Sequence, residues 1–184
     1  MSAVPEFAAI AEHLFSLKAQ GPKYGIDRMR ALAAALDHPE RVTPVVHIAG
    51  TNGKGSVAAM LDAILRAAGW RTGLFTSPHL VHVGERVQVD RRRLTDREII
   101  DFVRELQPVA DRIARATPDL RPSFFEWMTA MAFLQFARQR NVGAPDHRNV
   151  AASHEGEEAA GIGGGAIEAD ITGNCSNAEH VELA

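Results

Sequence analysis

The segment HIAGTNGKGS, at residues 47–56, holds three glycines, a lysine and two hydroxyl residues within seven positions. A glycine-rich turn between a strand and a helix directs several backbone N–H groups, and the positive end of the helix, at one point. Phosphate suits that arrangement. Gly50 and Gly53 allow close backbone approach, and Lys54 can reach the β- and γ-phosphates of a nucleotide. Ser56 can cap the helix or face a phosphate oxygen.

The segment departs from the general phosphate-loop pattern G-x-x-x-x-G-K-[ST]. Residue 48 is Ile, and Gly55 separates Lys54 from Ser56. The alternative is an ordinary strand-to-helix turn with a solvated lysine. We favour a phosphate loop because strand, loop and helix occur in the order that phosphate binding requires.

Three segments must position this loop. Residues 42–49 read VTPVVHIA, a short β-branched run that predicts a strand buried on both faces of a parallel sheet. Residues 56–70 predict a helix closed by Gly69, and residues 71–76 predict a second strand. This β-loop-α-β unit predicts an α/β fold, with a P-loop-type parallel sheet flanked by helices.

The rest of the first 140 residues adds helices and a hairpin. A helix that follows Pro5 places four apolar residues on one face, namely Phe7, Ile10, Leu14 and Leu17. Further helices are predicted at residues 26–36, 95–114 and 124–140, and a short strand or hairpin arm at residues 83–90. Thr95 is the expected N-cap of its helix, and Pro108 is expected to kink or divide that helix.

Three blocks of this chain resemble one known family in letters, order and spacing. They are GTNGKGS at residues 50–56, GLFTSPHLV at residues 73–81 and SFFEWMTAMAF at residues 123–133. Together they are similar to the folylpolyglutamate synthase and dihydrofolate synthase family of the ATP-dependent Mur ligase superfamily. The first block alone points to the superfamily, and the other two narrow the resemblance to its folate branch.

The resemblance implies an ATP- and Mg²⁺-dependent ligase of folate and one-carbon metabolism. Such a ligase phosphorylates a carboxylate of dihydropteroate or a folate and joins the acyl phosphate to L-glutamate. Phosphorylation supplies a leaving group, and metal ions with a lysine offset the charge on the transferring phosphoryl group. Ser77 falls on the family's Mg²⁺-binding serine, and Lys54 is the catalytic candidate. The residues implied to bind ATP are Gly50, Thr51, Asn52, Gly53, Lys54, Gly55 and Ser56.

The third block matches the family's pterin site. The resemblance implies that Phe124 and Phe125 stack on the pterin and that Glu126 accepts its N–H groups. The alternative is a core helix with Glu126 in its first turn. Arg86 resembles a family arginine in this loop, and the alternative is an ordinary surface arginine. His79 and His82 are expected to face solvent rather than to bind a metal.

The composition changes near residue 141. Residues 1–140 hold 19 Lys and Arg against 15 Asp and Glu, whereas residues 141–184 hold 1 against 8 and have no Phe, Trp or Tyr. This acidic segment, rich in glycine and alanine, is therefore predicted to be a disordered tail. Residues 1–140 are the predicted ATP-binding domain.

The family continues after its third block with a buried strand and a block that carries a second Mg²⁺-binding glutamate, and residues 141–184 match neither. We therefore expect an incomplete domain with a replaced end, which a frameshift, a truncation or a misannotation would produce. The sheet would lack strands beside the loop strand, leaving an open edge and bare apolar helix faces. These features predict a marginal, inactive fragment. A non-catalytic nucleotide-binding module and a Mur-type ligase of cell-wall synthesis are the alternatives.

Charge and cysteine content exclude some partners. A formal charge of −3 gives no reason to expect nucleic acid or an anionic membrane. One cysteine, Cys175, permits no internal disulfide, and neither a signal peptide nor a membrane span is evident. We expect a cytoplasmic monomer whose partners are small-molecule substrates.

Overall fold

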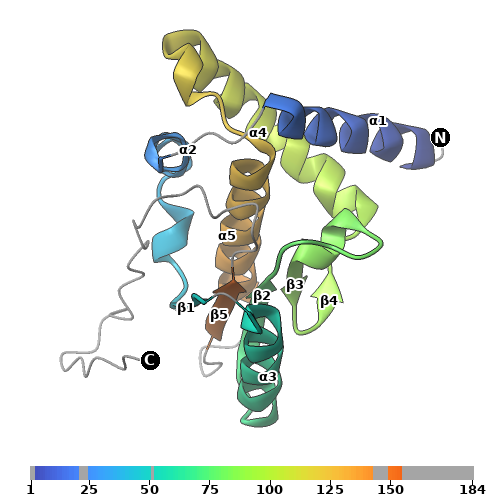
Figure 1. Cartoon of the computed structure of the whole chain (residues 1–184), viewed down its shortest axis with the longest axis vertical. Coiled ribbons are helices and arrows are strands. Elements are labelled where there is room, and N and C mark those ends of the chain that lie inside the picture. The colour runs from blue at the N-terminus through green and yellow to red at the C-terminus, as the bar shows by residue number, and fades with distance from the viewer. Residues whose placement is uncertain (1–2, 21–24, 51, 143–148, 155–184) are drawn as a thin grey trace.

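Residues 3–20, 25–50, 52–142 and 149–154 are described by a computed structural model (Figure 1). Its α-helices are α1 (Ala3–Ser16), α2 (Asp27–Ala35), α3 (Lys54–Ala67), α4 (Asp96–Ala116) and α5 (Phe124–Val142). Its strands are β1 (Val45–Ile48), β2 (Arg71–Phe75), β3 (Val87–Val89), β4 (Arg92–Arg93) and β5 (Asn149–His154). Its short 3-10 helices are η1 (Leu17–Gln20), η2 (Pro39–Arg41), η3 (Val83–Arg86) and η4 (Pro118–Leu120).

The strands form one sheet in the order β1-β5-β2-β3-β4. β5 runs parallel to both β1 and β2, whereas β3 runs antiparallel to β2 and to β4. The predicted α/β class and the β-loop-α-β unit are therefore confirmed. The predicted hairpin arm is β3, which is joined to β4 by a tight turn at Asp90 and Arg91, both with positive φ.

β5 corrects the prediction for the end of the chain. Residues 149–154 were expected to lie in a disordered tail, yet they form a strand between β1 and β2. The loop strand therefore has a neighbour on one side, and the prediction that no strand lies beside it is wrong there. Parallel partners on both sides determine this strand, although its own sequence favours a strand weakly. Residues 155–184 lie outside the described residues.

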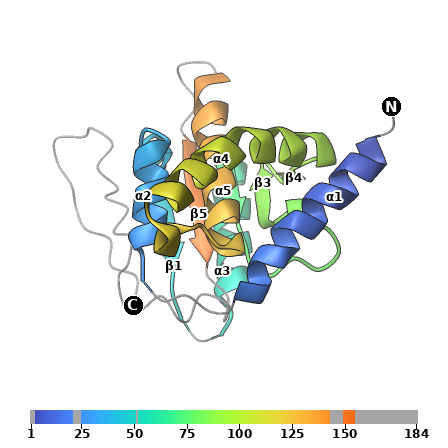
Figure 2. The same ribbon diagram turned by 90° about the horizontal axis from the view of Figure 1, so that it is seen from above.

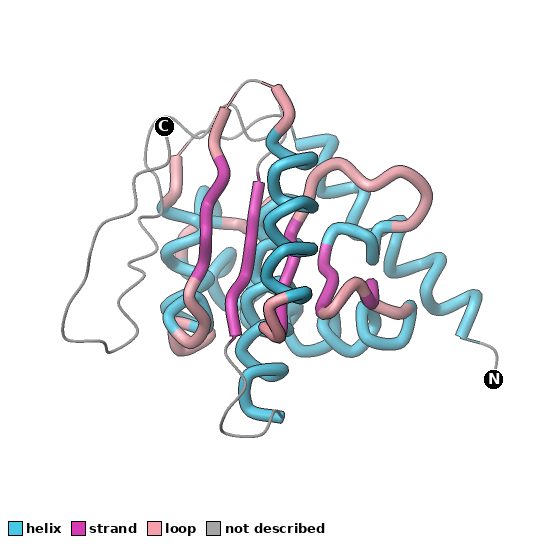
Figure 3. Tube along the Cα trace, turned by 90° about the horizontal axis from the view of Figure 1, so that it is seen from below, coloured by secondary structure: helices cyan, strands magenta, loops and turns pink. Residues whose placement is uncertain are grey.

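Helices cover the sheet on both faces (Figure 2). α3 packs on one face, mainly over β2 and β5, as Figure 3 shows. α5 packs on the other face, where a Cβ added to Gly73 would lie 2.6 Å from the Phe136 ring. Glycine at this point of β2 therefore permits the close approach of α5.

The large core lies on the α5 face and joins α1, α2, α4 and α5 to β2 and β3. Leu14 and Leu17 are buried in it and Phe7 and Ile10 pack against it, which confirms the predicted face of the first helix. α4 begins at the predicted N-cap, Thr95, with a reciprocal capping box. The helix continues without division through Pro108, which is exposed, so water can satisfy the carbonyl that proline leaves without a donor.

β1 differs from its prediction in burial. Val45 is buried, Val46 and Ile48 are half-buried, and His47 is exposed. Within the described residues β1 pairs with β5 alone and so forms an edge of the sheet. An edge strand is covered less than a central one, which is why burial on both faces is not observed. No helix among the described residues is long and apolar enough to cross a membrane.

Candidate functional site

The glycine loop follows the carboxyl end of β1 and opens α3. Gly50 and Gly53 have φ angles of 148° and 76°, which side-chain-bearing residues rarely adopt, so glycine is required at both. Gly53 is the N-cap of α3, and Ser56 lies inside the first turn. The predicted capping role of Ser56 is therefore wrong. Since the N-cap has no side chain, no cap oxygen occupies the first N–H groups of the helix.

Lys54 is the first residue of α3 and folds back over the loop. Its Nζ donates a 2.6 Å hydrogen bond to the carbonyl oxygen of Gly50. This bond brings a cation to the point where the loop and the helix N-terminus meet. Thr51, predicted to bind ATP, lies outside the described residues, and Asn52 and Ser56 are exposed.

Ser77 lies just beyond the carboxyl end of β2, at the same edge of the sheet as the glycine loop. Its side chain is buried, and its Oγ accepts a 2.8 Å hydrogen bond from Nη1 of Arg86. Nε of Arg86 donates to Nδ1 of His79, also at 2.8 Å. Arg86 is fully buried, so the alternative of an ordinary surface arginine is wrong. A buried guanidinium needs hydrogen-bond acceptors, and here Nε and Nη1 bond to His79 and Ser77 and so orient both side chains.

The segment between β2 and η3 is held by one carboxylate. Glu85 accepts hydrogen bonds from the backbone N–H groups of Leu80, Val81 and His82. These bonds, the one from Leu80 foremost, keep the pKa of Glu85 below its ordinary value of 4.5.

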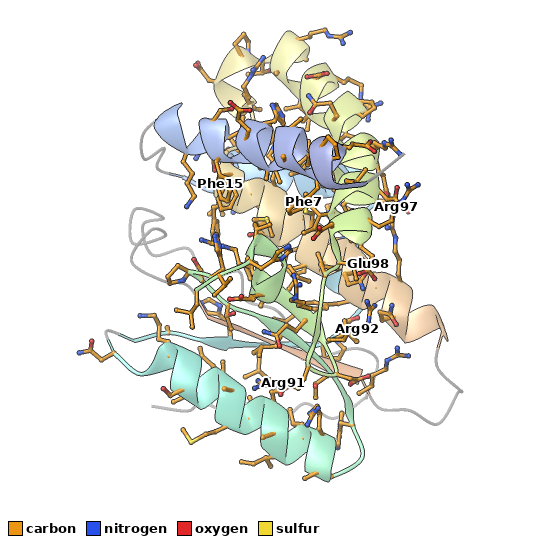
Figure 4. All side chains as sticks on the ribbon, turned by 90° about the vertical axis from the view of Figure 1, so that its right-hand side faces the viewer. Phe7, Phe15, Arg91, Arg92, Arg97 and Glu98 are labelled. Atoms are coloured by element: carbon orange, nitrogen blue, oxygen red, sulfur yellow. The ribbon has the colours of Figure 1, made fainter. Side chains whose placement is uncertain are left out.

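Neither histidine of this segment simply faces solvent, contrary to the prediction. Both are half-buried. Nε2 of His82 lies 2.8 Å from Oδ1 of Asp96, and its ring stacks on Phe7 at 5.3 Å between centroids. Figure 4 shows Phe7 and Phe15 on the side of α1 toward this segment.

Phe124 lies at the start of α5 and contacts cationic and aromatic groups. Nζ of Lys18 lies 4.7 Å and Cζ of Arg86 5.0 Å from its ring centroid. The Phe15 ring stacks on it at 5.6 Å. Arg86 therefore joins the Ser77 region to the Phe124 region, which are far apart in the sequence. Lys18 and Phe15 were missed by sequence reasoning, and no local pattern marks them.

Glu126 is buried in the first turn of α5. Its carboxylate lies 2.9 and 3.2 Å from Nε of Arg28, and it accepts a 2.6 Å hydrogen bond from the backbone N–H of Ser123. Phe125 is half-buried and packs on Phe75 at 5.9 Å. These contacts are those of the core-helix alternative, and the pterin role of the three residues stays a prediction.

The described residues contain no group of three His, Cys, Asp or Glu side chains able to hold a metal ion. Ser77 Oγ is a hard oxygen ligand of the kind that Mg²⁺ accepts. Mg²⁺ commonly binds through one or two side chains together with substrate phosphates and water. The donor set therefore fits a Mg²⁺–nucleotide complex and does not by itself hold a bare ion.

Two curated relatives of this chain carry the same name. The chain is 40% identical over 122 residues to the "Dihydrofolate synthase/folylpolyglutamate synthase" of Bacillus subtilis, which covers 66% of this chain and 28% of that protein. It is also 40% identical over 136 residues to the protein of the same name from Mycobacterium tuberculosis, covering 68% and 28%. The chain thus spans less than a third of the length of these curated relatives. No family model matches it.

Solved structures agree with the sequence matches. The folylpolyglutamate synthase of Thermotoga maritima superimposes with a TM-score of 0.70 at 33% identity, covering 81% of this chain and 33% of that structure. The folylpolyglutamate synthase of Mycobacterium tuberculosis, complexed with ADP and AMPPCP, gives 0.67 at 34% identity, covering 80% and 32%.

Proposed function

Given that this chain belongs to the folylpolyglutamate synthase and dihydrofolate synthase family, of which it spans only a part, we propose that it binds ATP at its glycine loop. In this proposal it supplies the nucleotide-binding part of an ATP-dependent ligase of folate metabolism. The observation that carries the proposal is the loop itself, where Gly50 and Gly53 have positive φ and the N-cap of α3, Gly53, has no side chain to occupy the first N–H groups.

Each residue of the loop has a separate part in this proposal. The first N–H groups of α3 bind phosphate oxygens, and Lys54 turns from the Gly50 carbonyl to the β- and γ-phosphates. Its positive charge offsets the charge that builds up as the phosphoryl group is transferred. The acceptor would be the carboxylate of a pteroate or folate, and the acyl phosphate would then react with L-glutamate.

Ser77 would hold Mg²⁺ together with the phosphates, and the ion would neutralise phosphate charge. Arg86 fixes the position of Ser77 Oγ through its 2.8 Å hydrogen bond. Phe124 would pack against the pterin at the place where Phe15 and Lys18 now contact it. Arg28 and the Ser123 N–H already donate to the Glu126 carboxylate. A pterin N–H group would therefore be a third donor to the same two oxygens.

Calorimetric titration with ATP and Mg²⁺ tests the proposal directly. The wild-type chain should bind, and Lys54→Ala should weaken binding about tenfold or more, since a charge-assisted contact to phosphate is lost. Arg97→Ala is the matched control, because it removes one positive charge from an exposed position on α4 and should leave binding unchanged. Absence of binding by the wild-type chain would remove the nucleotide proposal altogether.

We further propose that the chain does not complete the ligation alone. Its described residues offer Ser77 but no cluster of acidic ligands, and its loop strand lies at an edge of the sheet. A coupled assay for ADP in the presence of dihydropteroate and L-glutamate should show no consumption of ATP. Release of ADP with formation of the glutamate conjugate would show that the chain is an active ligase. Binding without consumption also fits a non-catalytic nucleotide-binding module.

A further inference from the structure

Asn52, in the glycine loop, is the one asparagine of this chain that precedes a glycine. The other four are followed by valine at Asn141 and Asn149, by cysteine at Asn174 and by alanine at Asn177. In an Asn-Gly pair the backbone nitrogen of the glycine can attack the side-chain amide carbon of the asparagine, because glycine has no side chain to obstruct the approach. A branched valine at the same position hinders this attack. The chemistry of spontaneous deamidation is therefore concentrated at Asn52.

Both reacting groups are open to water in the folded chain. Asn52 and Gly53 are exposed. The Gly53 carbonyl oxygen accepts a 2.9 Å hydrogen bond from the N–H of Val57, but the N–H of Gly53 donates no hydrogen bond to any other described residue. An amide N–H that is bonded inside a helix or a sheet must be released by local opening before its nitrogen can react. Gly53 is the N-cap of α3 and stands outside the helix ladder, so its nitrogen needs no such release.

Two other asparagines provide a comparison within the same chain. Asn141 lies in α5 and Asn149 is the first residue of β5. The nitrogens placed to attack them belong to Val142 and Val150, which lie in the same helix and the same strand. Regular structure and a branched neighbour therefore both oppose the reaction at these two positions, and neither opposes it at Asn52.

We propose that Asn52 is a site of spontaneous deamidation and that the reaction ends nucleotide binding as the protein ages. The Gly53 nitrogen forms a bond to Cγ of Asn52 and closes a succinimide ring, while the side-chain nitrogen leaves as ammonia and takes the Gly53 proton. Water then opens the ring at either carbonyl, which gives aspartate or isoaspartate at this position. The modification itself depends on the Asn-Gly pair alone, whereas its effect on the nucleotide rests on the proposed binding of ATP.

Each product disturbs the loop in its own way. Aspartate places a negative charge just before the N-cap of α3, where the helix dipole and Lys54 favour an anion. This carboxylate competes with nucleotide phosphates for the same groups and repels them. Isoaspartate carries the chain through the side-chain carbon and so adds one methylene to the backbone between β1 and α3. That addition displaces Gly53 from the N-cap geometry that its φ of 76° sets.

Bound nucleotide slows the reaction in this proposal. Phosphate oxygens at the loop accept hydrogen bonds from its N–H groups and restrict the Asn52 side chain. Attack on the amide carbon then requires release of the nucleotide or local opening of the loop. The rate of deamidation would thus report how much of the protein carries nucleotide.

Peptide mapping after incubation without nucleotide, at mildly alkaline pH, tests the modification. Among the tryptic peptides, residues 42–54 hold Asn52 with no other asparagine or glutamine, and residues 141–148 hold Asn141. Chromatography with mass spectrometry should show aspartate and isoaspartate forms of the first peptide and an unchanged second peptide. The rate in the folded chain should lie within an order of magnitude of the rate in a synthetic peptide of residues 42–54.

Asn52→Gln is the matched control for the chemistry, because its longer side chain must close a larger ring and does so far more slowly. This variant should form no acidic product during the same incubation. A folded-chain rate more than an order of magnitude below that of the synthetic peptide would overturn the modification. Equal deamidation at Asn141, or an equal rate in Asn52→Gln, would overturn it as well.

Calorimetric titration with ATP and Mg²⁺ tests the consequence for binding. The purified acidic form of the aged chain, and freshly prepared Asn52→Asp, should each bind at least about tenfold more weakly than the fresh wild-type chain. Circular dichroism checks that both remain folded. ATP with Mg²⁺ present during the incubation should also slow the reaction at Asn52.

Equal affinity of the fresh and acidic forms would overturn the loss of binding, and so would an incubation rate that ATP leaves unchanged. If the fresh chain binds no ATP, the proposed function fails and the loss of binding fails with it. The peptide map contains no nucleotide, so it decides the modification in either case.

Discussion

The two faces of the sheet differ in how much of the described chain covers them. On one face α5 packs with α1, α2 and α4 around a large core of fully buried side chains. On the other face α3 packs over a small cluster centred on Ala58 and Leu74. The glycine loop opens α3 and so belongs to the thinly covered face. Stability and the candidate nucleotide site are thus placed largely on opposite faces of one sheet.

This difference bears on where the free energy of folding comes from. Buried apolar area provides most of the favourable free energy of folding, and the α5 face holds most of it. The α3 face contributes a loop and a helix whose outer surface remains apolar and exposed. Substitutions on the two faces should therefore differ sharply in cost.

The largest effect is expected in the α5-face core. Phe102 on α4 is 2% exposed, and Phe102→Ala should lower the free energy of unfolding by about 3–5 kcal/mol through lost burial and the cavity left behind. Urea unfolding followed by circular dichroism measures the loss. Ile64→Ala, the matched apolar truncation on the α3 face, should change it by less than about 0.5 kcal/mol. Similar costs for the two variants would contradict the contrast between the faces.

A slightly smaller effect is expected at the buried ion pair of the same face. Arg28→Met should leave the Glu126 carboxylate with the Ser123 N–H as its remaining bond among the contacts described, at a cost of about 3 kcal/mol. The same urea experiment measures it. Adding Glu126→Gln to Arg28→Met should recover part of the loss, because the neutral amide needs no counter-charge. A double variant whose loss equals the sum of the two single losses would show that the pair is not coupled.

The α3 face should respond more weakly, at the contact that ties α3 to β2. Oδ1 of buried Asp62 accepts a 2.5 Å hydrogen bond from Thr72 Oγ1. Asp62→Ala should cost about 2 kcal/mol, since it leaves a buried hydroxyl without this partner. Arg66→Ala removes only a half-exposed cation 3.7 Å from the same carboxylate and should cost less than about 0.5 kcal/mol in the same assay. Equal losses would mean that the ion pair, and not the hydrogen bond, holds α3.

The sequence predicts those parts of each face whose signals are local. Helical spacing indicates α1, α4 and α5, and the capping box at Thr95 and Glu98 marks where α4 begins. The glycine loop can be recognised from sequence because glycine stands at the two positions, Gly50 and Gly53, where the backbone adopts positive φ. β5 cannot be recognised from sequence, because NVAASH has little strand character of its own. It becomes a strand by pairing with β1 and β2, which lie about 100 and 80 positions earlier in the chain.

The candidate site was predicted only as separate pieces. Ser77 and the residues at the start of α5 come from two sequence blocks, and Arg86 brings them together. Its complete burial is not readable from sequence, since arginine is rarely buried unless the fold supplies partners. The contact of Lys18 with Phe124 is equally unreadable from sequence, because η1 and the start of α5 meet only in the folded chain.

The smallest effect is expected at the N-terminal end of α4, on the α5 face, where Glu98 lies beside Arg92 of the β3–β4 hairpin (Figure 4). Burial raises the pKa of Glu98, but hydrogen bonds from Arg92 and Thr95 outweigh it and lower that pKa from 4.5 to about 2. A carboxylate with a depressed folded-state pKa stabilises the fold above its unfolded value and loses that contribution as the pH falls. Unfolding stability should therefore decrease between pH 4.5 and pH 2, by about 1 kcal/mol after allowance for solvent screening at this partly exposed pair. Urea midpoints of wild type and Glu98→Gln measured at pH 7, 4 and 3 should converge as the pH falls, and a gap that stays constant would assign the decrease to other carboxylates.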